Sequence, residues 1–94
     1  MGLMMIKVDE ALKQKLWNEL EKAHGWHPDL CRKDQYGTLV QYPDYQVRQS
    51  EYGWDIDAWN SRNEPIDLYD ADETSTLKVV HCRKLHHVPP SYFL

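Results

Sequence analysis

The stretch Tyr52-Gly53-Trp54-Asp55-Ile56-Asp57-Ala58-Trp59 decides the fold of this chain of 94 residues. Apolar and acidic residues alternate along it. In an extended segment, Trp54, Ile56 and Ala58 lie on one side, and Asp55 and Asp57 share the other. This alternation predicts a β-strand with one apolar face and two carboxylates on the opposite face.

An amphipathic helix is predicted before this strand, over residues 9–24. Leu12, Leu16 and Leu20 recur at intervals of four residues, which places them on one face of a helix. Asp9 is a suitable N-cap, and Gly25 is suited to end the helix. The N-terminal quarter of the chain therefore supplies one helix with an apolar face for packing.

Short extended segments and one more helix complete the expected fold. Strands are predicted at 38–42 and 66–69, with a turn at 60–65 between the central strand and the second of these. A final helix is expected from Thr74 or Ser75 to about His86, because Pro89-Pro90 follows it. The expected fold class is α+β, with residues 1–94 forming a single domain.

Composition and charge narrow the class of protein. Eleven basic and fifteen acidic side chains give a formal charge of -4, which argues against nucleic-acid binding by the whole surface. The apolar fraction of 41% is sufficient for a folded core. The chain shows no signal-peptide or membrane-spanning pattern, so we expect a cytoplasmic protein with no membrane contact, in which Cys31 and Cys82 are reduced.

The charge is distributed unevenly along the chain. Residues 1–50 are neutral, residues 51–75 carry eight acids against Arg62, and residues 76–94 carry three basic residues and no acid. Carboxylates followed by a histidine-containing segment are typical of a site for a divalent cation, with Asp57 and His81 as the first candidates. A solvated acidic loop followed by an ordinary helix explains the same pattern.

Several short motifs together resemble the small bacterial and phage HNH endonuclease domains. They are Arg32-Lys33-Asp34, Tyr36-Gly37, Asp44-Tyr45 and the run from Ser50 to Asp57. The HNH-like region covers residues 32–88. The resemblance implies a ββα-metal core, in which two short antiparallel strands are closed by a C-terminal helix.

The resemblance also implies that the catalytic machinery is degenerate. Asp57 stands at the position of a metal ligand, but Ala58 stands where the family has the histidine that activates water. Thr76 and Leu85 stand where the family has an orienting asparagine and a helix asparagine. An alanine methyl group cannot accept a proton, and loss of a general base costs about 100- to 10,000-fold in rate. No catalytic position is intact in this alignment.

The leading functional hypothesis is therefore a catalytically inactive, HNH-like interaction protein. A phage or mobile-element inhibitor of a nuclease or nucleic-acid-binding complex is the specific form of this hypothesis, with a protein as the partner and no cofactor. Acidic surfaces can occupy basic grooves, and aromatic residues and arginine are enriched at protein interfaces. The candidate interface residues are Trp59, Arg62, Asp67, Asp70, Asp72 and Glu73, with Asn60 beside them.

Two alternatives remain open from the sequence. In a divergent metal-dependent DNA endonuclease, Asp57 and His81 would hold Mg²⁺, Mn²⁺, Ni²⁺ or Zn²⁺, and His86 or His87 would replace the missing base. In a weak DNA-binding remnant, phosphate contacts would come from the basic residues of the final predicted helix. These residues are Lys78, Arg83 and Lys84.

Overall fold

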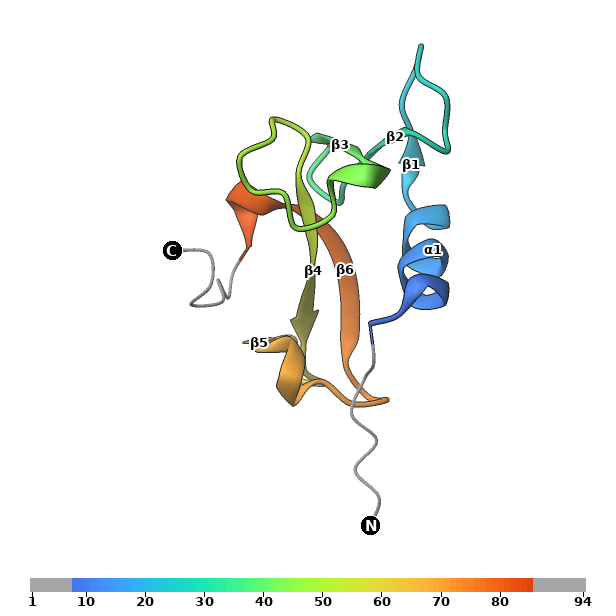
Figure 1. Cartoon of the computed structure of the whole chain (residues 1–94). Coiled ribbons are helices and arrows are strands. Elements are labelled where there is room, and N and C mark those ends of the chain that lie inside the picture. The colour runs from blue at the N-terminus through green and yellow to red at the C-terminus, as the bar shows by residue number, and fades with distance from the viewer. Residues whose placement is uncertain (1–7, 86–94) are drawn as a thin grey trace.

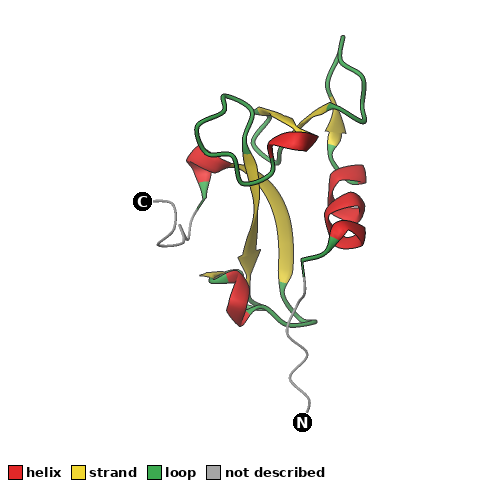
Figure 2. Ribbon diagram, viewed as in Figure 1, coloured by secondary structure: helices red, strands yellow, loops and turns green. Residues whose placement is uncertain are grey.

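The computed structural model describes residues 8–85 of the chain. It contains one helix and two small antiparallel sheets of three strands each, which confirms the predicted α+β class (Figures 1 and 2). The strand orders are β1-β2-β3 and β5-β4-β6. The elements are α1 (Glu10–Asn18), β1 (Glu21–Lys22), β2 (Cys31–Lys33), β3 (Leu39–Gln41), β4 (Trp54–Trp59), β5 (Pro65–Ile66), β6 (Thr76–His81) and the 3₁₀ turns η1 (Tyr42–Asp44), η2 (Leu68–Asp70) and η3 (Cys82–Lys84).

The stretch around Trp54 forms the central strand, as its alternation predicts. β4 pairs with β6 along its whole length, with Trp54 opposite His81 and Ala58 opposite Leu77. The other face of β4 is also covered, since Asp55 and Asp57 are buried. The predicted arrangement of apolar and acidic residues on opposite faces is therefore correct, but neither face is open to water.

The core lies where α1 packs against the face of β4 and β6 that carries Trp54. Trp17 of α1 and Trp54 of β4 are both fully buried, with ring centroids 5.5 Å apart. Tyr42 and Tyr45 surround the Trp54 ring at centroid distances of 5.8 and 4.9 Å. Burial of aromatic rings of this size contributes strongly to the hydrophobic stabilisation of a domain this small.

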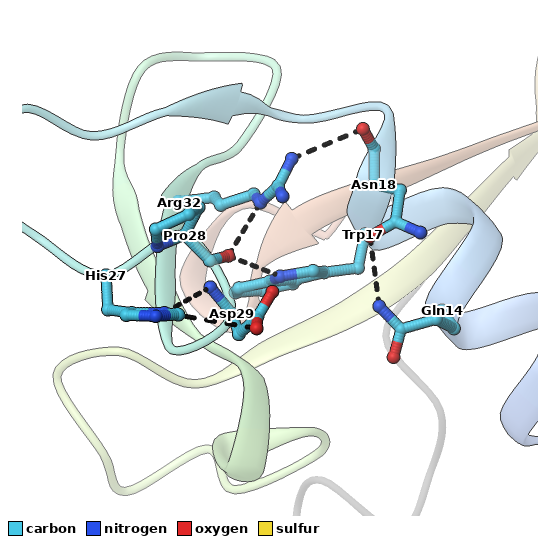
Figure 3. Close-up of polar contacts among 7 residues, drawn as sticks. All are labelled: Gln14, Trp17, Asn18, His27, Pro28, Asp29 and Arg32. Atoms are coloured by element: carbon cyan, nitrogen blue, oxygen red, sulfur yellow. Dashed lines mark hydrogen bonds and ion pairs between the residues drawn. The ribbon is translucent and has the colours of Figure 1, made fainter.

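The helix ends earlier than its leucine pattern predicts. α1 stops at Asn18, and residues 21–22 pair with residues 32–33 as strand β1. The guanidinium group of Arg32 donates hydrogen bonds to the carbonyl groups of Asn18 and Leu20 (3.2 and 3.1 Å), the first of which is drawn in Figure 3. Arg32 thus satisfies carbonyl groups at the helix end that have no partner within the helix.

The prediction of a C-terminal helix is wrong for the described residues. Residues 76–81 form strand β6, followed only by the short turn η3 and by Leu85. β-branched Thr76, Val79 and Val80 favour a strand, and β4 supplies a hydrogen-bonding partner over six residue pairs. The helix that the HNH resemblance implies is thus replaced by a strand up to residue 81. His86, His87 and Pro89-Pro90 lie outside the described residues.

The shorter predictions have mixed outcomes. Residues 39–41 form β3 within the predicted strand 38–42, and residues 60–65 contain the predicted turn. The predicted strand 66–69 is mostly wrong, because β5 ends at Ile66 and a 3₁₀ turn follows. Cys31 and Cys82 are both buried as thiols. No helix within residues 8–85 is long and apolar enough to cross a membrane.

Candidate functional site

The structure does not bring the two candidate metal ligands together. Asp57 of β4 lies opposite Lys78 of β6, whereas His81 lies opposite Trp54, three residue pairs further along the sheet. Side chains of paired residues share a face and successive residues alternate, so Asp57 and His81 point to opposite faces. The strand register therefore keeps these two candidate ligands apart.

The His81 side chain is instead engaged at the end of β6. Its Nδ1 accepts a hydrogen bond from the backbone N–H of Arg83 (3.1 Å), which places the proton of the neutral ring on Nε2. Nε2 then donates to the carbonyl oxygen of Glu51 (2.6 Å). Nδ1 therefore stabilises the transition from β6 into η3, and Nε2 connects that transition to the loop before β4. Within residues 8–85, no three His, Cys, Asp or Glu side chains form a group suited to a metal ion.

Asp34, which carries part of the HNH resemblance, has a structural role. One oxygen of its buried carboxylate accepts hydrogen bonds from the backbone N–H groups of Tyr36 and Thr38 (2.9 and 2.8 Å), and this shapes the turn between β2 and β3. The other oxygen accepts the backbone N–H of His81 (2.8 Å). One side chain thus connects the first sheet to the second.

Arg32, in the middle of β2, has a comparable role. Its Nε donates to the carbonyl oxygen of Pro28 (2.7 Å), which also accepts the indole N–H of Trp17 (3.0 Å), as Figure 3 shows. The guanidinium group is buried and reaches the end of α1 as well. Arg32 therefore connects the helix, the loop before β2 and the first sheet.

The three degenerate catalytic positions do not converge in space. Ala58 is buried and points to the core side of β4, beside Leu77. Thr76 begins β6 and points to the opposite face of the sheet, whereas Leu85 follows η3 beyond the other end of that strand. A shared active site at these positions would need a different arrangement of β6.

The predicted interface residues near the turn between β4 and β5 differ in accessibility. Trp59 is only 9% exposed, and the Nζ atom of Lys78 lies 5.4 Å from its ring centroid. The prediction that Trp59 is a surface contact is therefore wrong. Arg62 is exposed and pairs with Glu64 at 3.6 Å. Asn60 stabilises the turn, because its Oδ1 accepts the backbone N–H groups of both Arg62 and Glu64.

The remaining candidates form the segment Asp67–Glu73, which we call the acidic segment. Asp67 accepts the backbone N–H of Tyr69 (3.0 Å), and Asp72 accepts that of Thr74 (2.9 Å), so both carboxylates hold turns. Hydrogen bonds from the hydroxyl and backbone N–H groups of Thr74 lower the pKa of Asp72. Asp70 and Glu73 are exposed. The acidic segment therefore combines two carboxylates that hold turns with two that are exposed.

Tyr69 is the residue of the acidic segment that sequence reasoning missed. It is 79% exposed, more than any other large hydrophobic side chain in the described part of the chain. The 3₁₀ turn η2, which Asp67 caps, holds its backbone. An aromatic residue within a run of acids is a signal that the sequence does contain, but the expected strand at 66–69 concealed it.

The predicted phosphate-contacting residues lie on different elements. Lys78 belongs to β6 and covers the Trp59 ring. Lys84, in η3, donates from Nζ to the hydroxyl of Thr38 (2.6 Å) and lies 5.4 Å from the Tyr36 ring centroid. Arg83 is exposed beside it. The prediction that these residues share a helix is wrong, since they extend from the middle of a strand to the turn beyond it.

Asp55 is buried on the face of β4 opposite Trp54, and its charge acts on the Tyr45 hydroxyl. Oδ1 of Asp55 accepts the backbone N–H of Ile56 (2.7 Å), and Gln46 donates to Oδ2 (3.4 Å). Burial, and then the negative charge of Asp55, raise the pKa of the Tyr45 hydroxyl well above its usual range. Asp55 thus belongs to the interior, and the exposed negative charge of residues 51–75 is smaller than their sequence total.

Comparison of the chain with protein-family models, with curated proteins and with solved structures finds no match.

Proposed function

We propose that this chain is a non-catalytic interaction protein that binds a basic surface through the acidic segment. The observation that carries the proposal is the exposure of Tyr69 between carboxylates that are held in place by turns. The partner class that fits is a protein whose basic groove binds nucleic acid. Fixed carboxylates can take the place of phosphate groups in such a groove.

Tyr69 is suited to be the centre of this contact. Tyrosine combines a large apolar ring with a hydroxyl group, and it loses little conformational entropy when it is immobilised. Aromatic anchors of this kind carry much of the binding free energy at protein interfaces, while surrounding charges mainly guide association and exclude wrong partners. Asp70 and Glu73 would supply these charges.

Under this proposal, the resemblance to HNH nucleases reflects the evolutionary origin of the scaffold. Arg32, Asp34 and Trp54 all support the fold, so an HNH-derived scaffold could keep these residues after losing its catalytic residues. Under this proposal the chain is a phage or mobile-element inhibitor of a nuclease or nucleic-acid-binding complex. The step from scaffold to inhibitor rests on analogy and on the charge of the acidic segment.

The proposal predicts a specific loss of partner binding on substitution of Tyr69. Immobilised protein should capture a protein partner from lysate of the native host, both with and without nuclease treatment. Tyr69→Ala should weaken binding of that captured partner by about 30-fold, equivalent to about 2 kcal/mol, because a central aromatic anchor is removed. Asp70→Asn with Glu73→Gln should slow association and flatten its dependence on salt.

Tyr36→Ala is the matched control, because Tyr36 is also an exposed tyrosine but lies in the turn between β2 and β3. It should leave partner binding within about twofold, which is less than 0.5 kcal/mol. Capture that disappears after nuclease treatment would contradict the proposal, because it would show that the partner is held through nucleic acid. Equal binding by wild type and the Tyr69→Ala variant would contradict it as well.

A further inference from the structure

The outer edge of β6 has main-chain groups that no described strand pairs with. β6 is the last strand of its sheet, with β4 on one side only. The backbone N–H of Cys82 bonds to Gly53 next to β4 (3.0 Å), and that of His81 points away, to Asp34 (2.8 Å). By the alternation of an antiparallel ladder, the N–H and C=O groups of Leu77 and Val79 also point away from β4.

This edge lies beside a cleft. The cleft has a volume of about 300 Å³, and its walls come from α1, the start of β1, the end of β2 and β6. In Figure 1, α1 lies beside β6 on the side away from β4. Its lining includes Leu16, Glu19, Leu20, Glu21, Leu77 and Val79.

We propose that the cleft is a binding site for an extended peptide segment of a partner protein, which adds as a strand to the outer edge of β6. Main-chain donors and acceptors at a strand edge are complementary to another extended backbone. The Asp34 carboxylate already accepts the next outward N–H, that of His81, and so occupies the place of a neighbouring strand at that end. The added strand would therefore begin opposite Val79 and continue past Leu77.

The residues that line the cleft indicate which side chains a bound peptide would carry. Residues opposite Leu77 and Val79 would point to the same face as these side chains, toward Leu16 of α1 and Leu20, which follows the helix. Valine or isoleucine fits those positions. A lysine or arginine fits at the end of the segment next to Glu19, because Glu19 is exposed at the carbonyl end of α1, whereas Glu21 already pairs with Lys33 at 3.6 Å.

The test uses the peptide acetyl-KTVTVTK-amide and the full chain labelled with ¹⁵N. Binding should shift the amide resonances of Leu77 and Val79 and slow their hydrogen exchange. N-methylation of both valines should weaken binding at least tenfold, because it removes the N–H groups that face β6. N-methylation of the second and third threonines should change binding less than twofold, because those N–H groups point away.

Two variants distinguish peptide binding at the cleft from peptide binding at the acidic segment. Glu19→Gln should weaken binding of the unmodified peptide by about threefold, as expected for an exposed ion pair, and Glu73→Gln should leave it unchanged. Equal binding of the two methylated peptides would overturn the proposal. It would also be overturned by resonance shifts centred on the acidic segment, or by protection of Leu77 and Val79 that rises with protein concentration alone, which would indicate a second copy of the chain.

Discussion

Replacement of Asp34 by alanine should lower the free energy of unfolding by about 3–5 kcal/mol, at the upper end of single substitutions. The buried carboxylate accepts three backbone N–H groups, from Tyr36, Thr38 and His81. Hydrogen bonds to a charged group contribute about 1.5–3 kcal/mol each, and a buried donor left without a partner adds its desolvation cost. Urea denaturation followed by tryptophan fluorescence measures the effect.

Hydrogen exchange at the His81 amide gives a local test of the same contact. It should accelerate in Asp34→Ala more than exchange at the other amides of β6, because its acceptor is lost. Asp34→Asn should recover about half of the lost stability, since one amide oxygen can still accept hydrogen bonds. Asp29→Ala is the control, because Asp29 is an exposed aspartate five residues earlier in the chain, and it should cost less than about 0.5 kcal/mol. A loss below 1 kcal/mol for Asp34→Ala would show that Asp34 does not connect the two sheets.

Replacement of Arg32 by alanine should cost about 2–4 kcal/mol. The substitution removes donors to the carbonyl group of Pro28, in the loop before β2, and to those of Asn18 and Leu20, at and just after the end of α1. Arg32→Lys should recover less than half of this, because a single ammonium group cannot reproduce the planar guanidinium fork. The indole N–H resonance of Trp17 should also shift, since it shares the carbonyl oxygen of Pro28 with Arg32.

The control for Arg32 is Arg62→Ala. Arg62 is exposed and forms only a surface ion pair with Glu64, so its loss should change stability by less than about 1 kcal/mol. Equal stability losses in Arg32→Ala and Arg62→Ala would contradict the structural role assigned to the buried guanidinium group.

The central strand could be predicted from the sequence because its signal is local. Alternation of apolar and acidic residues from Trp54 to Asp57 depends only on the period of a strand. Burial of the acidic face could not be predicted in the same way. Asp55 accepts a hydrogen bond from Gln46, and Asp57 lies opposite Lys78 of β6, so their surroundings come from other parts of the chain. The alternation itself is the same for a half-exposed strand.

The end of the helix and the nature of residues 76–81 depend on non-local contacts. Leu20 continues the helical pattern, but α1 stops at Asn18. There, Arg32 of β2 donates hydrogen bonds to the carbonyl groups of Asn18 and Leu20. Thr76–His81 is a strand because β4 offers a complete pairing edge. This segment is short, and the spacing of its apolar residues is compatible with either a helix or a strand.

The candidate site was predictable in composition but not in arrangement. The acidic segment and its exposed carboxylates follow from the sequence alone. The pairing of Asp57 with His81 is predicted from carboxylates that precede a histidine-containing segment. The strand register that places the two residues on opposite faces depends on the pairing of β4 with β6, which is not a local property of the sequence. The exposure of Tyr69 likewise depends on η2, which replaces the expected strand.

Incubation of the purified chain with supercoiled plasmid tests the non-catalytic function most directly. The assay is run with Mg²⁺, Mn²⁺, Ni²⁺ and Zn²⁺ in turn, with a chelator in parallel. We predict that the plasmid stays supercoiled with every metal, because Ala58 cannot act as a base and Asp57 and His81 lie on opposite faces of the sheet. Metal-dependent nicking that the chelator stops, and that both Asp57→Ala and His81→Ala abolish, would contradict this account.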